Sequence, residues 1–360
     1  MSGRGKVSGW SLAVFVLLLG SLILVHELGH FLTAKLFGVR VLEFALGFPP
    51  RLFSFRRGET LYSFNLIPLG GFNRMLGEED PSHPKSLAAK PPGPRLIILS
   101  AGSLAMFLFP FLLFPLAFMI PHSEVVGGEG IKVIQVVPNS PAYFADLKSG
   151  DEILAVDAEE VKDFDQLHEI INSKRGQEVT LLLRRDGGLK QVNLVPRESP
   201  PPGQGPMGIT LSWANPIIER RAYPPWKAVV LGAKQTWRVW VMFKEGLAAL
   251  IGGEARFTLA GPVGIAQATG EVARGGLMSL AAWTSFLSIN LGVINLLPIP
   301  ALDGGRIVFV LLEVLRGGKR IPVQRERLAH LIGLLVLVLL MVMVTYWDIL
   351  RIFEGGSLFR

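Results

Sequence analysis

Four long runs of apolar residues dominate the chain, and each is long enough to cross a membrane as a helix. A helix needs about 20 residues to span a hydrocarbon core of about 30 Å. The runs cover residues 10–36, 96–120, 277–315 and 328–352. The third run is overlong and is interrupted by prolines and an Asp-Gly-Gly sequence, so we expect it to be kinked or split. The pattern predicts a polytopic α-helical membrane protein with four transmembrane helices.

The composition agrees with this class, because half of the 360 residues are hydrophobic and the mean hydropathy is +0.43. Arg4 and Lys6 precede the first apolar run, as in a signal peptide. No small-residue cleavage site follows that run, so we expect it to be retained. The chain has no cysteine, which leaves His, Asp and Glu as candidate metal ligands and excludes disulfides.

The net charge of +7 does not indicate a nucleic-acid partner, because the basic residues lie in loops and are not interleaved with aromatic residues on one face. They concentrate between the first two spans and in the turn between the last two. The positive-inside rule then places both loops in the cytoplasm, and the large middle region and both termini outside.

The first span contains the sequence His26-Glu27-Leu28-Gly29-His30, an H-E-x-x-H motif. Residues four apart share one face of a helix, so both imidazoles can bind one zinc ion while Glu27 faces the attacking water. Ionisable groups are costly inside a membrane, which favours a functional site that hydrolyses a membrane-embedded substrate. Two His and a carboxylate also occur in iron oxygenases, but two His at this spacing around a Glu favour zinc.

Catalytic zinc usually has three protein ligands, so one more is needed. Asp303 is the candidate, because it places a carboxylate among apolar residues of the third run, where coordination to a cation would offset the cost of its charge. A second reading is that Asp303 caps a helix starting near Gly304. The remaining histidines, which we expect at surface or loop positions, are His83, His122, His168 and His330.

Residues 39–69 contain β-rich stretches bounded by Pro49-Pro50 and Gly70-Gly71, which predict a membrane-associated β-hairpin region. Non-helical backbone at membrane depth must be buried in protein or line a cavity, so we expect this region to lie against the metal site. Its edge can pair with an extended substrate. We expect the pairing segment to include Asn65, Leu66, Ile67, Gly70 and Gly71.

Residues 125–197 have the composition of a soluble α/β module, with strands at 131–137 and 179–183 and a helix at 164–173. The segments 138–142 and 148–157 resemble the core of a PDZ domain. This resemblance implies a groove in which a C-terminal peptide binds by strand addition, with residues 126–130 as a weak candidate for the carboxylate-binding loop. In the alternative, the module only restricts access to the metal site.

These features divide the chain into four parts. Residues 1–124 form an N-terminal membrane half with the His-Glu motif, the β region and the second span, and residues 125–197 form the PDZ domain. Residues 198–276 contain a Pro/Gly-rich linker and a helix, from about residue 223, that lies in the membrane interface. Residues 277–360 form the C-terminal membrane half with the Leu-Asp-Gly sequence.

Taken together, these motifs resemble the site-2 protease family of intramembrane zinc metalloproteases, in particular its bacterial members with a single PDZ insertion. The segments that carry the resemblance are 26–30, 47–48, 66–72, 261–264 and 295–305. It implies zinc ligands His26, His30 and Asp303, with Glu27 as the general base. It also assigns Asn290 and Asn295 to substrate binding or to hydrogen bonding near the metal, although buried amides also join helices to one another.

The resemblance further implies a zinc metalloendopeptidase of a bacterial inner membrane that cuts transmembrane segments of single-span proteins in regulated intramembrane proteolysis. In such proteases the substrates are anti-sigma factors or signal-peptide remnants, and the active site faces the cytoplasm. An alternative is a catalytically silent, membrane-anchored PDZ adaptor with a structural zinc site. A metal transporter is disfavoured, because polar groups converge on one place only.

Overall fold

The computed structural model describes residues 9–201, 204–252 and 260–354, so Arg4, Lys6 and residues 202–203 of the predicted linker lie outside the described residues. The chain divides into two compact units. The membrane unit comprises residues 1–120 and 222–360, and the inserted unit comprises residues 121–221. Each unit is described by itself below.

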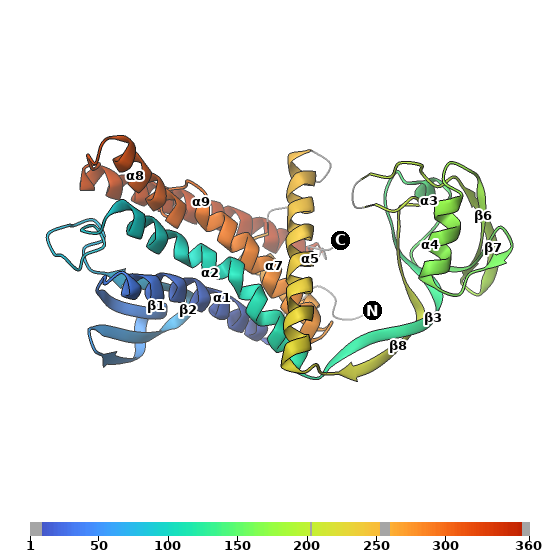
Figure 1. Cartoon of the computed structure of the whole chain (residues 1–360), viewed down its shortest axis with the longest axis horizontal. Coiled ribbons are helices and arrows are strands. Elements are labelled where there is room, and N and C mark those ends of the chain that lie inside the picture. Colours follow the sequence, from blue (N-terminus) through green and yellow to red (C-terminus); the bar gives the residue numbers. More distant parts are fainter. Residues whose placement is uncertain (1–8, 202–203, 253–259, 355–360) are drawn as a thin grey trace. The chain divides into compact units, whose positions relative to one another are not determined.

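The four predicted transmembrane helices are confirmed in the membrane unit (Figure 1). They are α1 (Gly9–Leu36), α2 (Pro92–Met119), α7 (Leu277–Leu296) and α9 (Val323–Phe353). The overlong third run is split as predicted, since α7 ends at Leu296 and α8 (Asp303–Leu315) begins after a short loop. Two further helices, α5 (Pro225–Ile251) and α6 (Pro262–Ala273), complete the helices of the described part of this unit.

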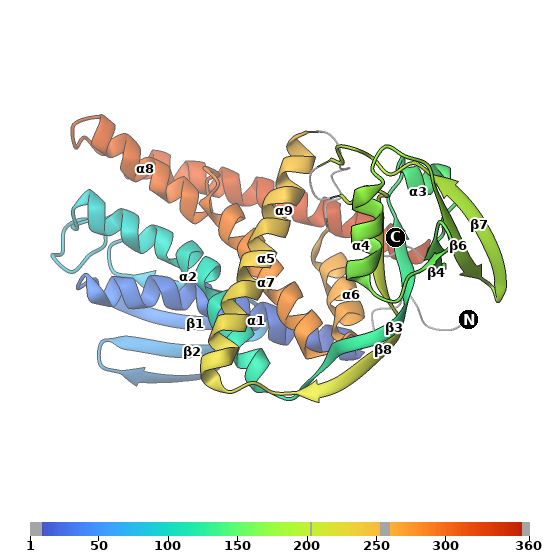
Figure 2. The same cartoon turned by 45° about the vertical axis from the view of Figure 1, so that its right-hand side comes forward.

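The centre of the membrane unit is a three-helix contact. Leu22 of α1 and Met106 of α2 are fully buried and pack with Leu287 of α7. The amphipathic helix α5 runs across α2 and α7 rather than alongside them (Figure 2). Its Val239 packs on Phe114 of α2, while Trp226, Trp237 and other large apolar residues of α5 stay exposed. The helix α5 is not among the four candidate spans, and its location in the membrane interface stays a prediction.

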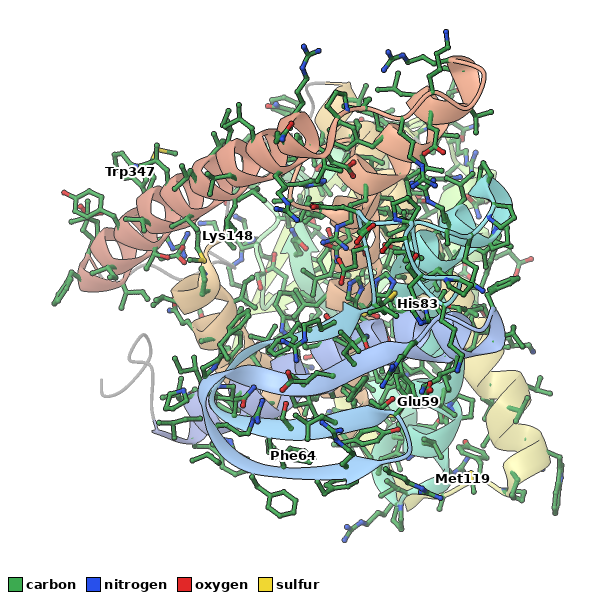
Figure 3. The ribbon with its side chains drawn as sticks, turned by 90° about the vertical axis from the view of Figure 1, so that its left-hand side faces the viewer. Glu59, Phe64, His83, Met119, Lys148 and Trp347 are labelled. Atoms are coloured by element: carbon green, nitrogen blue, oxygen red, sulfur yellow. The ribbon has the colours of Figure 1, made fainter. Side chains whose placement is uncertain are left out.

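The predicted β region forms two long strands, β1 (Val41–Arg57) and β2 (Thr60–Met75), which lie over α1 (Figure 3). The register folds this hairpin back on itself, because Phe44 is opposite both Asn73 and Tyr62. Residues 41–46 therefore lie between residues 61–64 and residues 71–75. Glu43 is buried in this sheet and accepts hydrogen bonds from Ser63 at 2.8 Å and Arg51 at 2.7 Å.

The inserted unit is the predicted α/β PDZ-like domain. Its sheet has the strand order β7 (Gly188–Leu194), β6 (Val179–Arg185), β4 (Glu152–Val156), β3 (His122–Val136) and β8 (Ile209–Arg221), with β5 (Glu159–Glu160) pairing with β4. The helix α4 (Phe164–Ser173) lies beside β8, since the rings of Phe164 and Trp213 are 4.4 Å apart. The other helix of this unit is the short α3 (Pro141–Phe144).

Two details differ from the sequence-based expectations. The unit extends beyond residues 125–197, because β8, part of the expected linker segment, pairs along most of β3. The proposed carboxylate-binding loop at residues 126–130 is wrong, because these residues lie within β3. Glycines at 127, 128 and 130 suggested a loop, but Gly127 and Gly128 pair with Ile217 and Pro216 of β8.

Asp151, in the Ser-Gly-Asp sequence of the PDZ-like core, has a structural role. This carboxylate is buried and accepts two hydrogen bonds from Arg185, at 2.6 and 2.7 Å, and one from the backbone N–H of Lys148. Burial opposes ionisation of Asp151, but Arg185 and the Lys148 N–H outweigh it and hold its pKa below the ordinary value. The stabilisation is therefore present above the unfolded-state pKa and is lost as the pH falls through the lower folded-state pKa.

We expect Arg185→Leu to destabilise the inserted unit by about 3–5 kcal/mol at pH 7, because it leaves a buried carboxylate without its cation. Native-state hydrogen exchange of the β6 amides in the whole protein measures the change. The matched control is Arg184→Leu, which removes a half-exposed partner of Glu152 and should cost at most about 1 kcal/mol. Equal effects of the two substitutions would contradict this account.

Candidate metal centre

The candidate metal ligands of α1 lie where this helix packs closely against α2. A Cβ atom added to Gly29 would lie 2.9 Å from the carbonyl carbon of Ala101 and 2.9 Å from Cβ of Ala105. A Cβ atom on Gly102 would lie 2.6 Å from Cε1 of His26 and would also collide with Nε2 of His30. The glycines thus allow the two helices to meet with both imidazoles held between them.

The ring of His30 is oriented by the backbone of α2. Its Nδ1 lies 2.8 Å from the carbonyl oxygen of Ile98. Because a carbonyl oxygen only accepts hydrogen bonds, Nδ1 carries the proton and the lone pair of Nε2 is free for a metal. A metal-binding histidine is usually oriented in this way, by a hydrogen bond from the ring nitrogen that does not bind the metal.

Asp303 reaches the same place from the other end of the chain. Its Oδ2 lies 3.1 Å from Nε2 of His30 and 3.3 Å from Nε2 of His26. Gly304 and Gly305, in the first turn of α8, allow the preceding loop to pack closely against this turn, since a Cβ on Gly305 would lie 2.5 Å from the Ile299 carbonyl oxygen. The alternative role of Asp303 as a helix cap is not seen in the described structure, where α8 begins at Asp303 itself and no side chain caps it.

The three ligand atoms fit a zinc ion. They belong to the one group of candidate metal ligands found among the described residues, His26, His30 and Asp303. The two Nε2 atoms are 3.3 Å apart, and the oxygen is 3.1 and 3.3 Å from them. Bond lengths of about 2.05 Å in a tetrahedral site separate neighbouring ligands by about 3.3 Å. Two imidazoles and a carboxylate are also a ligand set of catalytic zinc, which leaves a fourth position open.

Glu27 is held by a residue that the sequence did not single out. Asn73 of β2 donates its side-chain N–H₂ to Oε2 of Glu27 at 2.9 Å and to the carbonyl oxygen of Glu27 at 2.5 Å. Asn73 lies two positions after Gly71, so both face the same side of the strand. A Cβ on Gly71 would lie 3.1 Å from Cγ of Glu27. In the sequence, the two-residue spacing from Gly71 was the only signal for Asn73, since its partner Glu27 is 46 residues away.

A cavity of about 340 Å³ opens beside these groups. It provides room for a substrate segment next to the candidate ligands. Its lining consists of His26, Glu27, His30, Gly71, Phe72, Asn73, Met75, Leu99, Asn295, Ala301, Leu302, Asp303 and Arg306.

Of the predicted substrate-binding residues, the structure brings Gly71 and Asn295 to this lining. Asn290 donates instead to the Phe286 carbonyl oxygen of its own helix at 2.8 Å, and Asn65 donates to the Gly47 carbonyl oxygen at 2.9 Å. Leu66, Ile67 and Gly70 are also absent from the residues that line the cavity. The strand segment next to the ligands is therefore residues 71–75, which follow the expected segment 65–71 along β2.

Two of the remaining histidines do not occupy surface or loop positions, so that expectation is wrong for them. His122 is buried in β3. His330 lies in α9, and its Nδ1 accepts a hydrogen bond of 2.8 Å from the backbone N–H of Ala301. Ala301 lies 29 residues before His330 in the sequence, which is why the sequence pattern missed this contact.

Comparison with known proteins agrees with this zinc-peptidase geometry. The model of peptidase family M50 matches residues 14–340. The chain belongs to this family, and it is a membrane zinc metalloprotease.

Similar proteins cover almost the whole chain. The zinc metalloprotease RasP of Geobacillus kaustophilus is 30% identical, with 95% of this chain and 98% of the relative covered. The regulator of sigma-W protease RasP of Bacillus subtilis is 28% identical, with 94% and 98% covered. Among solved structures, the PDZ domain of an SdrC-like protein from Listeria monocytogenes is 26% identical, with 24% of this chain and 90% of that chain covered and a TM-score of 0.22.

We expect Gly102→Ala to weaken zinc binding about 10–100-fold, because the added methyl group occupies the space of the two imidazoles. Chelator competition on purified protein measures the dissociation constant. Gly93→Ala is the matched control on the same helix, since a Cβ there meets nothing within 4 Å. Unchanged zinc affinity in Gly102→Ala would show that the imidazoles do not need this close helix contact.

Proposed function

We propose that the chain is an intramembrane endopeptidase that cuts transmembrane segments of single-span membrane proteins. The observation that carries this proposal is the position of the ligand group, between a helix long and apolar enough to span a membrane and the start of α8. Hydrolytic groups at that depth act on a substrate that is also in the membrane. The printed name of the Bacillus relative, a regulator of sigma-W protease, supports anti-sigma factors as substrates, and signal-peptide remnants are the other candidate class.

In this proposal His26, His30 and Asp303 hold the zinc ion. When bound, zinc lowers the pKa of water towards about 7 and polarises a carbonyl group. Glu27 takes the proton of the attacking water on Oε1 and later delivers it to the leaving amine. Asn73 supports this step, because its hydrogen bonds to Oε2 and to the Glu27 carbonyl oxygen fix the direction in which the carboxylate points.

A substrate helix has to lose its internal hydrogen bonds before a peptide bond can reach the metal. We propose that residues 71–75 of β2 receive the unwound segment, because they form an outer strand of the sheet and several of them line the cavity. Strand addition supplies main-chain hydrogen bonds without demanding a particular sequence. Asn295, at the α7 end of the cavity, supplies a side-chain amide for the same segment. The other predicted substrate-binding residues then act indirectly, by shaping α7 and β2. They are Asn290, Asn65, Leu66, Ile67 and Gly70.

The inserted PDZ-like unit is proposed to select substrates by binding a C-terminal peptide. The free edge of β8 and the neighbouring helix α4 form the groove for strand addition, which Trp213 and Phe164 line where they meet. A purely steric filter is the alternative, and it requires no groove.

We place the protein in a bacterial inner membrane, with the metal centre towards the cytoplasm and the PDZ-like unit outside. The support is the concentration of Arg and Lys in the loop between α1 and α2 and in the turn between α8 and α9. The bacterial source of the relatives agrees with this compartment.

We expect Glu27→Gln to lower the cleavage rate of a model transmembrane substrate by about 10²–10⁴-fold, because the amide cannot take the proton from water. Purified protein in detergent is assayed, and its zinc content is measured in parallel. Full zinc content with lost cleavage supports the mechanism, whereas wild-type cleavage by the variant would contradict it. If the wild-type protein cuts no transmembrane substrate but binds C-terminal peptides, the adaptor with a structural zinc site is the correct function.

Asn73→Val should lower kcat about tenfold or more with an unchanged zinc content, because Glu27 loses the two hydrogen bonds that orient it. Steady-state cleavage kinetics separate kcat from KM. Asn65→Val is the control from the same strand, since the Asn65 amide bonds only Gly47 in the described contacts. A change in KM alone would mean that Asn73 binds substrate and does not orient Glu27.

A further inference from the structure

We propose that His330 of α9 is a positioning residue for the metal centre, because it holds the backbone of Ala301 in the conformation that delivers Asp303 to the two histidines. The inference rests on the metal-binding role proposed for Asp303. It adds a residue outside the H-E-x-x-H and Leu-Asp-Gly sequences and links the last transmembrane helix to the metal centre.

The contact is a single hydrogen bond between two distant parts of the chain. The backbone N–H of Ala301 donates to Nδ1 of His330 at 2.8 Å. Nδ1 therefore carries no proton, and the imidazole is the acceptor in this bond. Ala301 precedes Asp303 by two residues, so a rotation of its backbone displaces the Asp303 carboxylate.

The backbone of Ala301 needs this support because its conformation is unfavourable. Its φ is +83°, a region that residues with a side chain rarely adopt. Among the described residues of the membrane unit, Ala301 is the only non-glycine residue with a positive φ. Such strained residues persist when surrounding contacts hold them, and they concentrate at functional sites.

The neighbouring turn of α9 holds the same loop. Gly333 lies one turn after His330 on the same face of the helix. A Cβ on Gly333 would lie 2.6 Å from the carbonyl carbon of Pro300. The ring of His330 also lies 5.4 Å from the ring of Phe309 in α8, centroid to centroid. His330 and Gly333 thus form a cradle for the loop between α7 and α8.

The second ring nitrogen of His330 faces its own helix, where Nε2 lies 4.0 Å from a carboxylate oxygen of Glu326, one turn earlier in α9. Most of the large apolar residues of this helix are exposed. Beyond Gly333 its buried residues are Val344 and Asp348, and Asp348 accepts a hydrogen bond of 2.7 Å from the N–H of Gly264 in α6. His330 is not itself a member of the ligand group. Its Nδ1 atom is therefore the group that holds the loop preceding Asp303.

The test compares two substitutions of His330 that differ in one acceptor atom. His330→Leu removes the acceptor for the Ala301 N–H, whereas the side-chain oxygen of Asn in His330→Asn can occupy nearly the position of Nδ1. Gln324→Leu is the control on an exposed position of the same helix. The readouts are the zinc dissociation constant, the absorption spectrum of the cobalt-substituted protein, and hydrogen exchange of residues 297–305 in the metal-free protein.

We expect His330→Leu to raise the zinc dissociation constant about tenfold or more, to alter the cobalt spectrum and to speed exchange in the loop. His330→Asn should restore most of the affinity, and Gln324→Leu should match the wild type. Adding Ala301→Gly to His330→Leu should also restore affinity, because glycine adopts a positive φ without strain. That rescue is specific to a backbone-positioning role.

Two results would overturn the inference. One is a wild-type dissociation constant and cobalt spectrum in His330→Leu. The other is an equal loss in His330→Leu and His330→Asn that Ala301→Gly does not relieve, which would mean that His330 only packs α9. The proposed metal site is tested separately by Asp303→Ala, since wild-type zinc affinity in that variant would overturn the site itself and the role of His330 with it.

Discussion

The close contact of α1 with α2 is the constraint on which the rest of the site depends. A helix that carries two histidines and a glutamate cannot expose them to lipid, because polar groups at membrane depth need partners. Gly29 and Gly102 allow the helix backbones to approach, so that the imidazoles lie against α2 and His30 finds the Ile98 carbonyl oxygen as a partner. Small residues at helix contacts serve the same purpose in membrane proteins generally.

The second constraint concerns the backbone segments that are not helical, parts of which lie next to the metal ligands. The loop between α7 and α8 and the sheet of β1 and β2 both lack helical hydrogen bonding. In a membrane such segments are stable only when protein covers them or a cavity receives them. Here the loop is covered by His330 and Gly333 of α9, and the strand 71–75 borders the cavity.

The sequence predicted what depends on local patterns. The four spans follow from the lengths of the apolar runs, and the split of the third follows from Pro298, Pro300 and the Asp-Gly-Gly sequence. The proximity of His26 and His30 follows from their spacing on a helix. Asp303 was identified because an unpaired carboxylate in an apolar run is energetically costly unless it binds a cation.

The features that the sequence did not predict all depend on contacts between distant residues. Asn73 is one polar residue among several in β2, and only the fold-back of the hairpin brings it to Glu27. The strand β8 was assigned to a linker segment, because its pairing with β3 joins segments about 85 residues apart. His330 lies in α9, a helix that was predicted from its apolar run alone. Nothing in the residues next to His330 therefore indicated the hydrogen bond to Ala301.

Charged contacts fix both ends of α8. Glu313 is buried between Arg95 of α2, at 2.7 Å, and Arg320, at 3.1 Å. Arg306, one turn after Asp303, pairs with Glu78 of the loop that follows β2 at 2.7 Å. A buried ion pair such as Arg95–Glu313 contributes little net stability, but losing one partner is costly, so this pair discriminates against other placements of the helix. With α8 tied to α2 and to this loop, and its first turn supported through Ala301 by α9, the position of the Asp303 carboxylate is set by three elements distant from it in sequence.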